Sequence, residues 1–288
     1  MNAQQRRIWL CADDYGMAPG INKAIRTLIA HGRLNATSVM IAAQYARDDQ
    51  ARELAVLNEP RKRALLGLHV TLSAPFQPVA QGFSPLRDGA FPSNIELLQL
   101  GLRRRLSQAV LHREIAAQID AFVDIFGRAP DYLDGHQHVH LFPGVRDAFL
   151  NAVKEKVPRA WVRQCGRPHA ARPLTDVKGH FLDLLSVGFR SKAHALAIAF
   201  NPAFHGAYEF TPKADFARLF PRFLRGMPDN GLLMCHPGFV DAALKSLDSL
   251  TDLREREFAF LDSAAFPGLL AAHGYVLADP SGEHGTAA

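Results

Sequence analysis

The stretch RIWLCADDYG, residues 7–16, sets the pattern on which the whole chain is built. Its apolar half predicts a buried strand over Arg7–Ala12, and two aspartates follow that strand directly. A helical pattern from about Ile21 to His31 comes next and stops at Gly32, a residue typical of helix ends. A strand, a polar turn and a helix in this order form one unit of an α/β fold.

The same alternation of short apolar segments and helical patterns continues along nearly the whole chain. The clearest helix is predicted over Glu114–Phe126, where large apolar residues recur at helical spacing before Gly127. This rhythm favours a parallel sheet with helices outside it, either an open doubly wound sheet or a barrel. The predicted strands are Arg7–Ala12, Ser38–Ala43, Ala64–Val70, Tyr132–His136, Ala160–Arg163, Leu196–Phe200, Gly231–Cys235 and Tyr275–Ala278.

Length and composition predict one globular domain. A chain of 288 residues with 48% hydrophobic and 21% charged residues can bury a single sizeable core. We place that domain at residues 1–278 and expect a disordered tail over residues 279–288. The three cysteines are far apart, and no apolar run reaches the length of a membrane span. We therefore expect a soluble, cytoplasmic protein with no membrane partner.

The charge balance gives no sign of a nucleic-acid partner. The chain carries 33 Lys and Arg against 28 Asp and Glu, a net charge of +5. These basic residues are dispersed, and the densest run, residues 103–105, lacks the interleaved aromatic side chains of nucleic-acid binding surfaces. We expect no nucleic-acid partner, and a homodimer is the default assembly.

One irregular region interrupts the alternation of strands and helices. Ser73–Ser93 contains four prolines and two glycines and is too long for a simple connection. Loops of this length inside compact domains are usually lids or binding loops. We expect it to border a functional site.

Reactive side chains gather where the predicted strands end. The carboxyl ends of parallel strands carry the catalytic groups of α/β folds, so these side chains are expected to share one rim. Each of them alone has an ordinary structural explanation, such as capping a helix. Five strands that all deliver such groups favour a common site. The residues are Asp13, Asp14, His69, Asp134, His136, Arg163 and His236.

A cluster of histidines follows the fourth predicted strand, in LDGHQHVH at residues 133–140. If the strand continues through them, His136, His138 and His140 leave along one face, because alternate side chains of a strand share a face. Neutral imidazole is a common metal ligand. From these residues alone, a metal site and a set of structural histidines remain equal alternatives.

The adjacent carboxylates of Asp13 and Asp14 favour the metal site. Two like charges at the end of a buried strand are unfavourable unless a cation or hydrogen bonds compensate. If they point to opposite sides, one can bind a metal and the other can accept a proton. One Asp and two His form a sensible site for a divalent ion, with positions left for water and substrate. His236, in the turn MCHPG, is then a candidate acid for a leaving group.

Several segments in order resemble the YdjC-like carbohydrate deacetylases, whose best-known members are chitooligosaccharide deacetylases. The resemblance extends over about residues 7–278. It rests on ADDYG at 12–16, Thr37-Ser38 with the apolar run after it, GLHVTL at 67–72, FGRAP at 126–130, LDGHQHVH at 133–140, MCHPG at 234–238 and RERE at 254–257. Position 135 is glycine here, where relatives often carry serine or alanine.

The resemblance implies a modified (β/α) barrel, similar to a TIM barrel, and hydrolysis of the N-acetyl group of an acetylated amino sugar. It also implies a divalent metal ion, magnesium or zinc, held by Asp14, His69 and His136. Asp13 would be the general base. The role of His236 as general acid leans on analogy with polysaccharide deacetylases.

The remaining candidates would contact substrate or support these groups. His138 and His140 would surround the metal or face the substrate, and a backbone N–H near Tyr15 would stabilise the oxyanion. Arg163 would hold Asp13 ionised or bind a sugar group, and an ordinary surface arginine at a strand end is an equal alternative. Aromatic side chains of Phe200–Tyr208 would suit sugar rings or equally belong to the core or an interface.

Two other classes of function compete with this interpretation. A different metal hydrolase on a barrel also uses closely spaced histidines, but typically at the first strand, where this chain has Asp-Asp. A sugar-binding or regulatory protein could keep the fold without the chemistry. Asp13 counts against it, because binding alone gives no reason for a second carboxylate beside a metal ligand.

Overall fold

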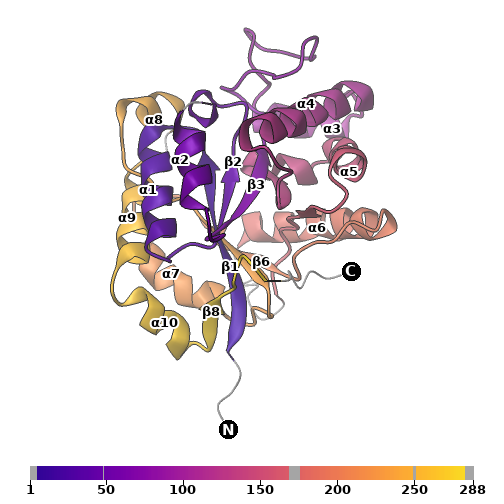
Figure 1. The fold of residues 1–288 in the computed structure, drawn as a ribbon. Helices are drawn as coiled ribbons and strands as arrows, with labels where there is room; N and C mark the ends of the chain where they lie inside the picture. Colours follow the sequence, from indigo (N-terminus) through magenta and orange to yellow (C-terminus); the bar gives the residue numbers. More distant parts are fainter. Residues whose placement is uncertain (1–4, 48, 169–175, 249–250, 283–288) are drawn as a thin grey trace.

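The computed structural model describes residues 5–47, 49–168, 176–248 and 251–282. The strands alternate with helices as the sequence predicts (Figure 1). The strands are β1 (Arg6–Tyr15), β2 (Ala36–Val39), β3 (Leu65–Val70), β4 (Tyr132–Gly135), β5 (Trp161–Val162), β6 (Phe204–His205), β7 (Gly231–Cys235) and β8 (Tyr275–Leu277). The helices are α1 (Pro19–Ala30), α2 (Asp49–Leu57), α3 (Asn94–Leu102), α4 (Gln108–Phe126), α5 (Val145–Lys156), α6 (Val177–Ala195), α7 (Phe216–Phe223), α8 (Ala242–Leu247), α9 (Asp252–Asp262) and α10 (Phe266–Ala272), with 3-10 turns η1 (Gln44–Ala46) and η2 (His136–Leu141).

The strands form one parallel sheet with the order β5-β4-β3-β2-β1-β7-β6, and β8 pairs with the beginning of β1. The sheet curls into a half-barrel, with α1, α8 and α9 on one flank and α3 to α6 on the other (Figure 1). The predicted single-domain α/β barrel is confirmed in this open form. Its parallel strands end at one rim, which is where the candidate residues lie.

Close packing inside the sheet depends on one glycine. Gly67 in β3 faces the ring of Tyr132 in the neighbouring strand, and a Cβ at this position would lie 2.4 Å from ring carbons. Tyr132 in turn stacks on Trp161, with ring centroids 4.5 Å apart. Only a residue without a side chain lets the two strands keep this arrangement.

The helix predictions are confirmed with longer bounds. The helix expected over Glu114–Phe126 begins at Gln108, where the Ser107 side chain accepts a hydrogen bond from the Val110 N–H. It ends at Gly127, whose φ of 64° is the left-handed conformation that glycine adopts at helix ends.

Two strand predictions are corrected. Leu196–Phe200 is not a strand: Leu196 caps α6, Ala197 turns with a φ of 53°, and Phe200 alone forms an isolated bridge. The segment is the turn that follows α6, and the next strand along the chain is β6. The strand predicted over Ser38–Ala43 begins and ends earlier: β2 extends from Ala36 to Val39.

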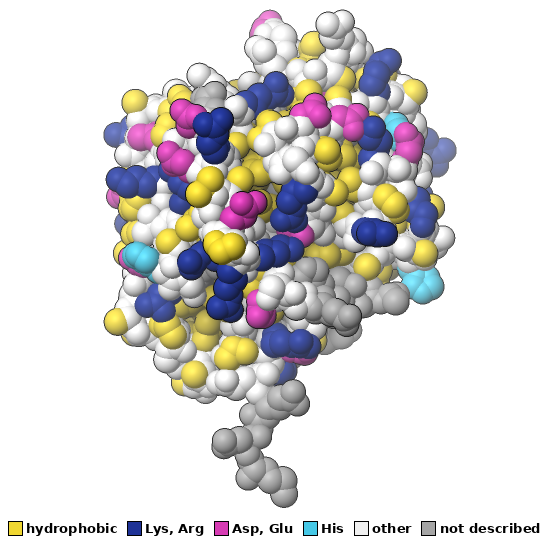
Figure 2. Space-filling model, in the orientation of Figure 1, with side chains coloured by type: hydrophobic (Ala, Val, Ile, Leu, Met, Phe, Trp, Pro, Cys, Tyr) yellow, Lys and Arg dark blue, Asp and Glu magenta, His cyan; other side chains and the backbone are white. Residues whose placement is uncertain are grey.

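The surface carries no basic stripe on the face shown in Figure 2, where Lys and Arg side chains lie scattered among Asp and Glu. Among the helices of the described ranges, none is long and apolar enough to cross a membrane. The predicted tail begins with ordered contacts, because Ser281 donates to Asp279. Residues 283–288 of that prediction lie outside the described residues.

Candidate metal centre

The site begins with the two aspartates at the end of β1. Both carboxylates are buried, and the pairing of β1 with β2 shifts register between Ala12 and Tyr15. Asp14 has a φ of 70°, a left-handed conformation that is uncommon for a residue other than glycine. Adjacent side chains of a regular strand point to opposite faces, so this irregular backbone is what lets both carboxylates line the same cavity.

Asp14, His69 and His136 come together as one group whose ligand atoms all lie within 4.8 Å of one another. The Oδ1 atom of Asp14 is 3.0 Å from Nδ1 of His136 and 3.5 Å from Nε2 of His69. Three elements supply them: β1, β3 and the turn η2 after β4. The three residues that the family resemblance implied as ligands are therefore neighbours at one rim.

His69 is held from behind by Asp134. Its Nδ1 atom lies 2.5 Å from Oδ1 of Asp134, and its Nε2 atom faces Asp14. Burial disfavours the charged imidazole, but Asp134 and Asp13 outweigh burial and raise the pKa of His69 to about 10. An imidazole whose rear nitrogen is fixed by a carboxylate is the usual arrangement of a histidine metal ligand.

Asp13 is paired with a buried arginine rather than with the ligand group. The guanidinium of Arg163 donates to both of its carboxylate oxygens, at 2.6 and 2.7 Å. The same guanidinium lies 2.6 Å from Oδ2 of Asp134. Of the two roles considered for Arg163, a contact with Asp13 agrees with this geometry.

Asp14 has an arginine of its own. The Nη2 atom of Arg254, in α9, is 2.7 Å from Oδ2 of Asp14 and 2.7 Å from Oδ2 of Asp248. Burial alone would raise the pKa of Asp14, but Arg254 and the neighbouring His136 hold it well below the ordinary value. The carboxylate is therefore ionised and ready to bind a cation at neutral pH.

The donor set fits a divalent cation. One carboxylate and two imidazoles from different elements face one another, and the rear nitrogen of one imidazole is already bound by a carboxylate. Such N and O donors suit zinc and related ions, and a three-residue set leaves positions for water and substrate. A second group, Cys11, Asp13 and Asp134, is also closely spaced, but the guanidinium of Arg163 already neutralises it.

The histidine cluster does not run along one face as predicted. The strand ends at Gly135, and η2 follows, with Gln137 and His138 in left-handed conformations (φ 53° and 59°). His138 reaches the cavity, whereas His140 turns into the core, where it packs on Phe149 and Phe189. Its Nε2 atom lies 2.9 Å from the Arg163 carbonyl oxygen. The expected substrate-facing role of His140 does not agree with this position.

The Tyr15 side chain also points away. It is fully buried, and its hydroxyl donates to the Gln50 carbonyl oxygen and accepts from Arg26. Arg163 is likewise fully buried and lies outside the set of cavity-lining residues, so the alternative of direct sugar binding by its side chain is dropped.

His236 lies at the end of β7, on the cavity wall. Burial lowers the pKa of its imidazole to about 4, so the ring is neutral at pH 7. Its Nδ1 atom has no hydrogen-bond partner among the described residues. Its backbone N–H donates to Glu257 of α9 at 2.5 Å, and Glu257 also accepts from the Tyr208 hydroxyl at 2.6 Å. Burial raises the pKa of Glu257 to about 7.

The candidate residues surround a cavity of about 320 Å³. From the irregular loop, Phe76 packs edge-on against the ring of His136, so this loop borders the site as predicted. Phe204, His205 and Tyr208 pack among other aromatic rings or His138 instead of lining the cavity, and Phe210 takes the expected aromatic position. The lining residues are Asp13, Asp14, His69, Asn94, His136, Gln137, His138, Lys178, Phe210, Met234, His236, Asp248 and Arg254.

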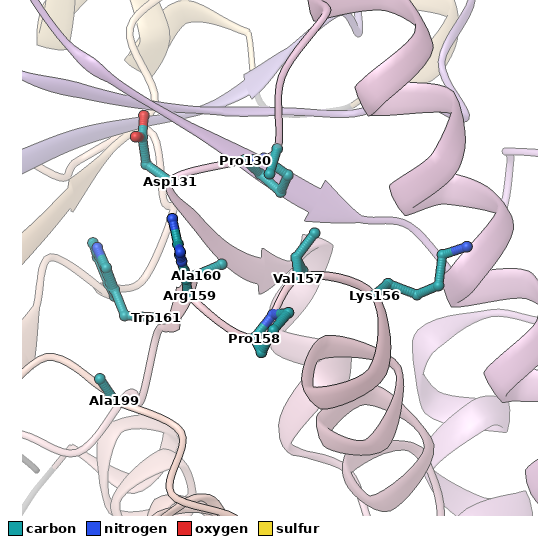
Figure 3. Close-up of a pocket in the computed structure, with 10 residues that line it drawn as sticks. Pro130, Asp131, Lys156, Val157, Pro158, Arg159, Ala160, Trp161 and Ala199 are labelled. Atoms are coloured by element: carbon teal, nitrogen blue, oxygen red, sulfur yellow. The ribbon is translucent and has the colours of Figure 1, made fainter.

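A larger hollow lies at the opposite end of the strands (Figure 3). Its lining includes Asp131 before β4, Arg159 before β5 and Trp161 at the start of β5. The carboxylate of Asp131 forms ion pairs there with Lys62 and Arg128. Its volume of about 720 Å³ exceeds that of the rim cavity, but none of the candidate catalytic or ligand residues reaches it.

Sequence reasoning gave no role to several residues that complete the site. Asp134 was recognised only as a strand-end residue, although it orients His69. Arg254 and Glu257 lie in the RERE segment, and their spacing of three residues on a helix was the available signal that both face the same side. Lys178 and Phe210 carry no motif that would have singled them out.

A parallel half-barrel with carboxylates and imidazoles at its carboxyl rim defines an α/β protein with a candidate metal centre. Residues 7–272 match the sequence pattern of the YdjC-like proteins, and the chain belongs to that family.

Curated relatives carry deacetylase names. A chitooligosaccharide deacetylase of Salmonella paratyphi B is 27% identical over 279 residues, which cover 94% of this chain and 96% of that protein. A carbohydrate deacetylase of Homo sapiens is 32% identical over 162 residues, 54% of this chain and 47% of the human protein.

The fold has a counterpart among solved structures. An Enterococcus faecalis protein named for cellobiose-phosphate cleavage superimposes with a TM-score of 0.68 at 21% identity. The match covers 96% of this chain and 98% of that protein, so it extends to the whole half-barrel.

Proposed function

We propose that the protein is a metal-dependent hydrolase that removes the N-acetyl group of an acetylated amino sugar or oligosaccharide, resembling chitooligosaccharides. The observation that carries the proposal is the pair of adjacent aspartates with separate partners. The carboxylate of Asp14 faces two imidazoles. The neighbouring carboxylate of Asp13 accepts hydrogen bonds from Arg163. The deacetylase names of relatives that match over nearly the whole chain support the same reaction.

The proposed ligands are Asp14, His69 and His136, and magnesium or zinc is the proposed ion. A divalent ion bound there would polarise the amide carbonyl and acidify a water molecule. Asp13 takes the proton of the attacking water, because its carboxylate lines the cavity next to the ligand group. Arg163 keeps that carboxylate oriented through two hydrogen bonds.

The leaving amine needs a proton when the C–N bond breaks. The imidazole of His236 is neutral at pH 7, with a pKa lowered to about 4 by burial. We therefore assign delivery of the proton to Asp13, which has just received one from water. The ring of His236 lines the same cavity, where we propose that it donates an N–H hydrogen bond to the reacting group, and Glu257 accepts from its backbone N–H.

The rest of the cavity supplies sugar contacts. Phe210 packs edge-on against His236, with ring centroids 5.2 Å apart, and the ammonium of Lys178 lies 4.9 Å from the Phe210 ring centroid. An aromatic face suits the apolar side of a sugar ring. Lys178, Asn94 and His138 also line the cavity and offer polar groups for hydroxyl or amide groups.

The test is acetate release from N,N′-diacetylchitobiose by the chelated protein and by the protein loaded with Zn²⁺ or Mg²⁺. We expect release only with metal, and loss of at least about 100-fold in kcat for Asp13→Asn with metal binding retained. An Asp13→Asn variant that is as active as the wild type contradicts the role of Asp13. Metal binding without turnover of any acylated amino sugar favours a sugar-binding protein instead.

Two further expectations are proposals of the same kind. A cytoplasmic location is supported by three buried cysteines that form no disulfide. A homodimer stays a prediction, which light scattering of the purified protein tests.

A further inference from the structure

Arg254 divides the two oxygens of Asp14 between different partners. Oδ2 accepts a hydrogen bond from Nη2 of Arg254, whereas Oδ1 faces both His136 and His69. The guanidinium is almost fully buried, and Asp248 accepts from the same nitrogen on its other side. The arginine is thus held in place by two carboxylates.

This division restricts how Asp14 can bind a cation. A carboxylate can bind a metal through one oxygen or through both. Chelation through both oxygens would place the ion between Oδ1 and Oδ2, next to the positive charge of Arg254. Charge repulsion in a buried site disfavours that arrangement.

We propose that Arg254 is a positioning residue that makes Asp14 a one-oxygen ligand, so that neighbouring coordination positions remain open for water and the substrate carbonyl. The inference rests on the proposed metal centre and deepens it. It gives the RERE segment of α9 a function: Arg254 sets the metal ligand on one side of the cavity, and Glu257 sets His236 on the other.

A positioning role and a merely structural role predict opposite changes in metal binding. If Arg254 only fills space beneath α9, its loss loosens the site and weakens metal binding. If it blocks one oxygen of Asp14, its loss frees that oxygen and removes a repelling charge. Binding then becomes tighter while catalysis falls.

The experiment titrates the chelated full-length protein with Co²⁺ alone and records affinity and the visible absorption of the bound ion. For Arg254→Met we expect Co²⁺ affinity to rise about tenfold, since a positive charge beside the ion is gone. We also expect weaker absorption, because a carboxylate bound through both oxygens raises the coordination number. Arg256→Met is the matched control: it removes an exposed arginine of α9 that donates to the Pro212 carbonyl oxygen, and neither readout should change.

Weaker Co²⁺ binding by Arg254→Met, or an unchanged spectrum, overturns the positioning role and leaves the proposed function standing. A wild-type protein that binds no Co²⁺ overturns the proposed metal centre together with this inference. If Arg254→Met does not fold, a crystal structure of the Co²⁺-loaded wild type decides. Oδ2 of Asp14 should still contact Arg254, and an ion bound by both Asp14 oxygens refutes the proposal.

Discussion

Replacing Asp134 with asparagine should damage metal binding through the tautomer of His69. Asp134 uses Oδ1 for Nδ1 of His69 and Oδ2 for the donors of Ser38 and Arg163. The guanidinium of Arg163 can only donate, so it keeps the carbonyl oxygen of an asparagine on its own side. The amide NH₂ of Asp134→Asn must then face His69.

An NH₂ group that faces Nδ1 of His69 requires a lone pair on that atom. The imidazole proton moves to Nε2, the nitrogen that faces Asp14 at 3.5 Å and would bind the metal. Loss of a carboxylate behind a histidine ligand typically weakens metal binding by about 10- to 100-fold. This corresponds to about 1.4 to 2.7 kcal/mol of binding free energy.

Calorimetric titration with Zn²⁺ against a competing chelator measures this effect directly. Ser38→Ala is the matched control, because it removes one donor to the same carboxylate but keeps the charge and the His69 contact. Its Zn²⁺ affinity should change by less than about threefold, a cost of one ordinary hydrogen bond at most. A folded Asp134→Asn protein with wild-type Zn²⁺ affinity would refute the reasoning about His69.

Three further changes test the surroundings of the site. Arg163→Met should lower the free energy of unfolding by about 3 to 5 kcal/mol in urea titrations, because the buried Asp13 loses its partner; a loss below about 1 kcal/mol contradicts this. Burial raises the pKa of Glu257 from 4.5 to about 7, so its protonated form favours the folded state. Its contribution to the free energy of unfolding is complete below pH 4.5, and about 3 kcal/mol of it is lost as the pH rises to 7. In Glu257→Gln the free energy of unfolding should vary less with pH over this range. Gly67→Ala should cost about 1 to 3 kcal/mol in thermal melts through its clash with Tyr132, whereas Gly32→Ala, at a position with open space, tests the backbone effect of a positive φ alone.

Much of the fold follows from local pattern. The apolar stretch of β1, the end of α1 before Gly32 and the end of α4 at Gly127 are visible in the sequence, because each depends on neighbours a few residues away. The strand predicted over Leu196–Phe200 was wrong because its apolar residues form the turn that follows α6, where Ala197 has a positive φ and only Phe200 makes a bridge to a strand.

The site was predictable in its residue types but not in its partners. Asp13, Asp14 and His69 were predicted to share one site, because they lie at the ends of predicted strands and parallel strands bring their carboxyl ends together. The direction of His140 was not predictable, because two left-handed residues break the alternation assumed for a strand. Arg254 contacts a carboxylate 240 positions away in the chain, and no local pattern encodes such a contact.

Two adjacent aspartates acquire different chemistry because each has its own arginine. Arg163, at the end of β5, binds both oxygens of Asp13, and among the described histidines the nearest imidazole nitrogen, that of His69, is 4.0 Å from that carboxylate. Arg254, from α9, donates to Oδ2 of Asp14, and Oδ1 faces two imidazoles. The left-handed φ of Asp14 keeps both carboxylates at one cavity, because a regular extended strand would have put the second carboxylate on the opposite face. The backbone twist therefore brings the two carboxylates to one site, and their different arginines support the roles that we propose, Asp14 as metal ligand and Asp13 as proton carrier.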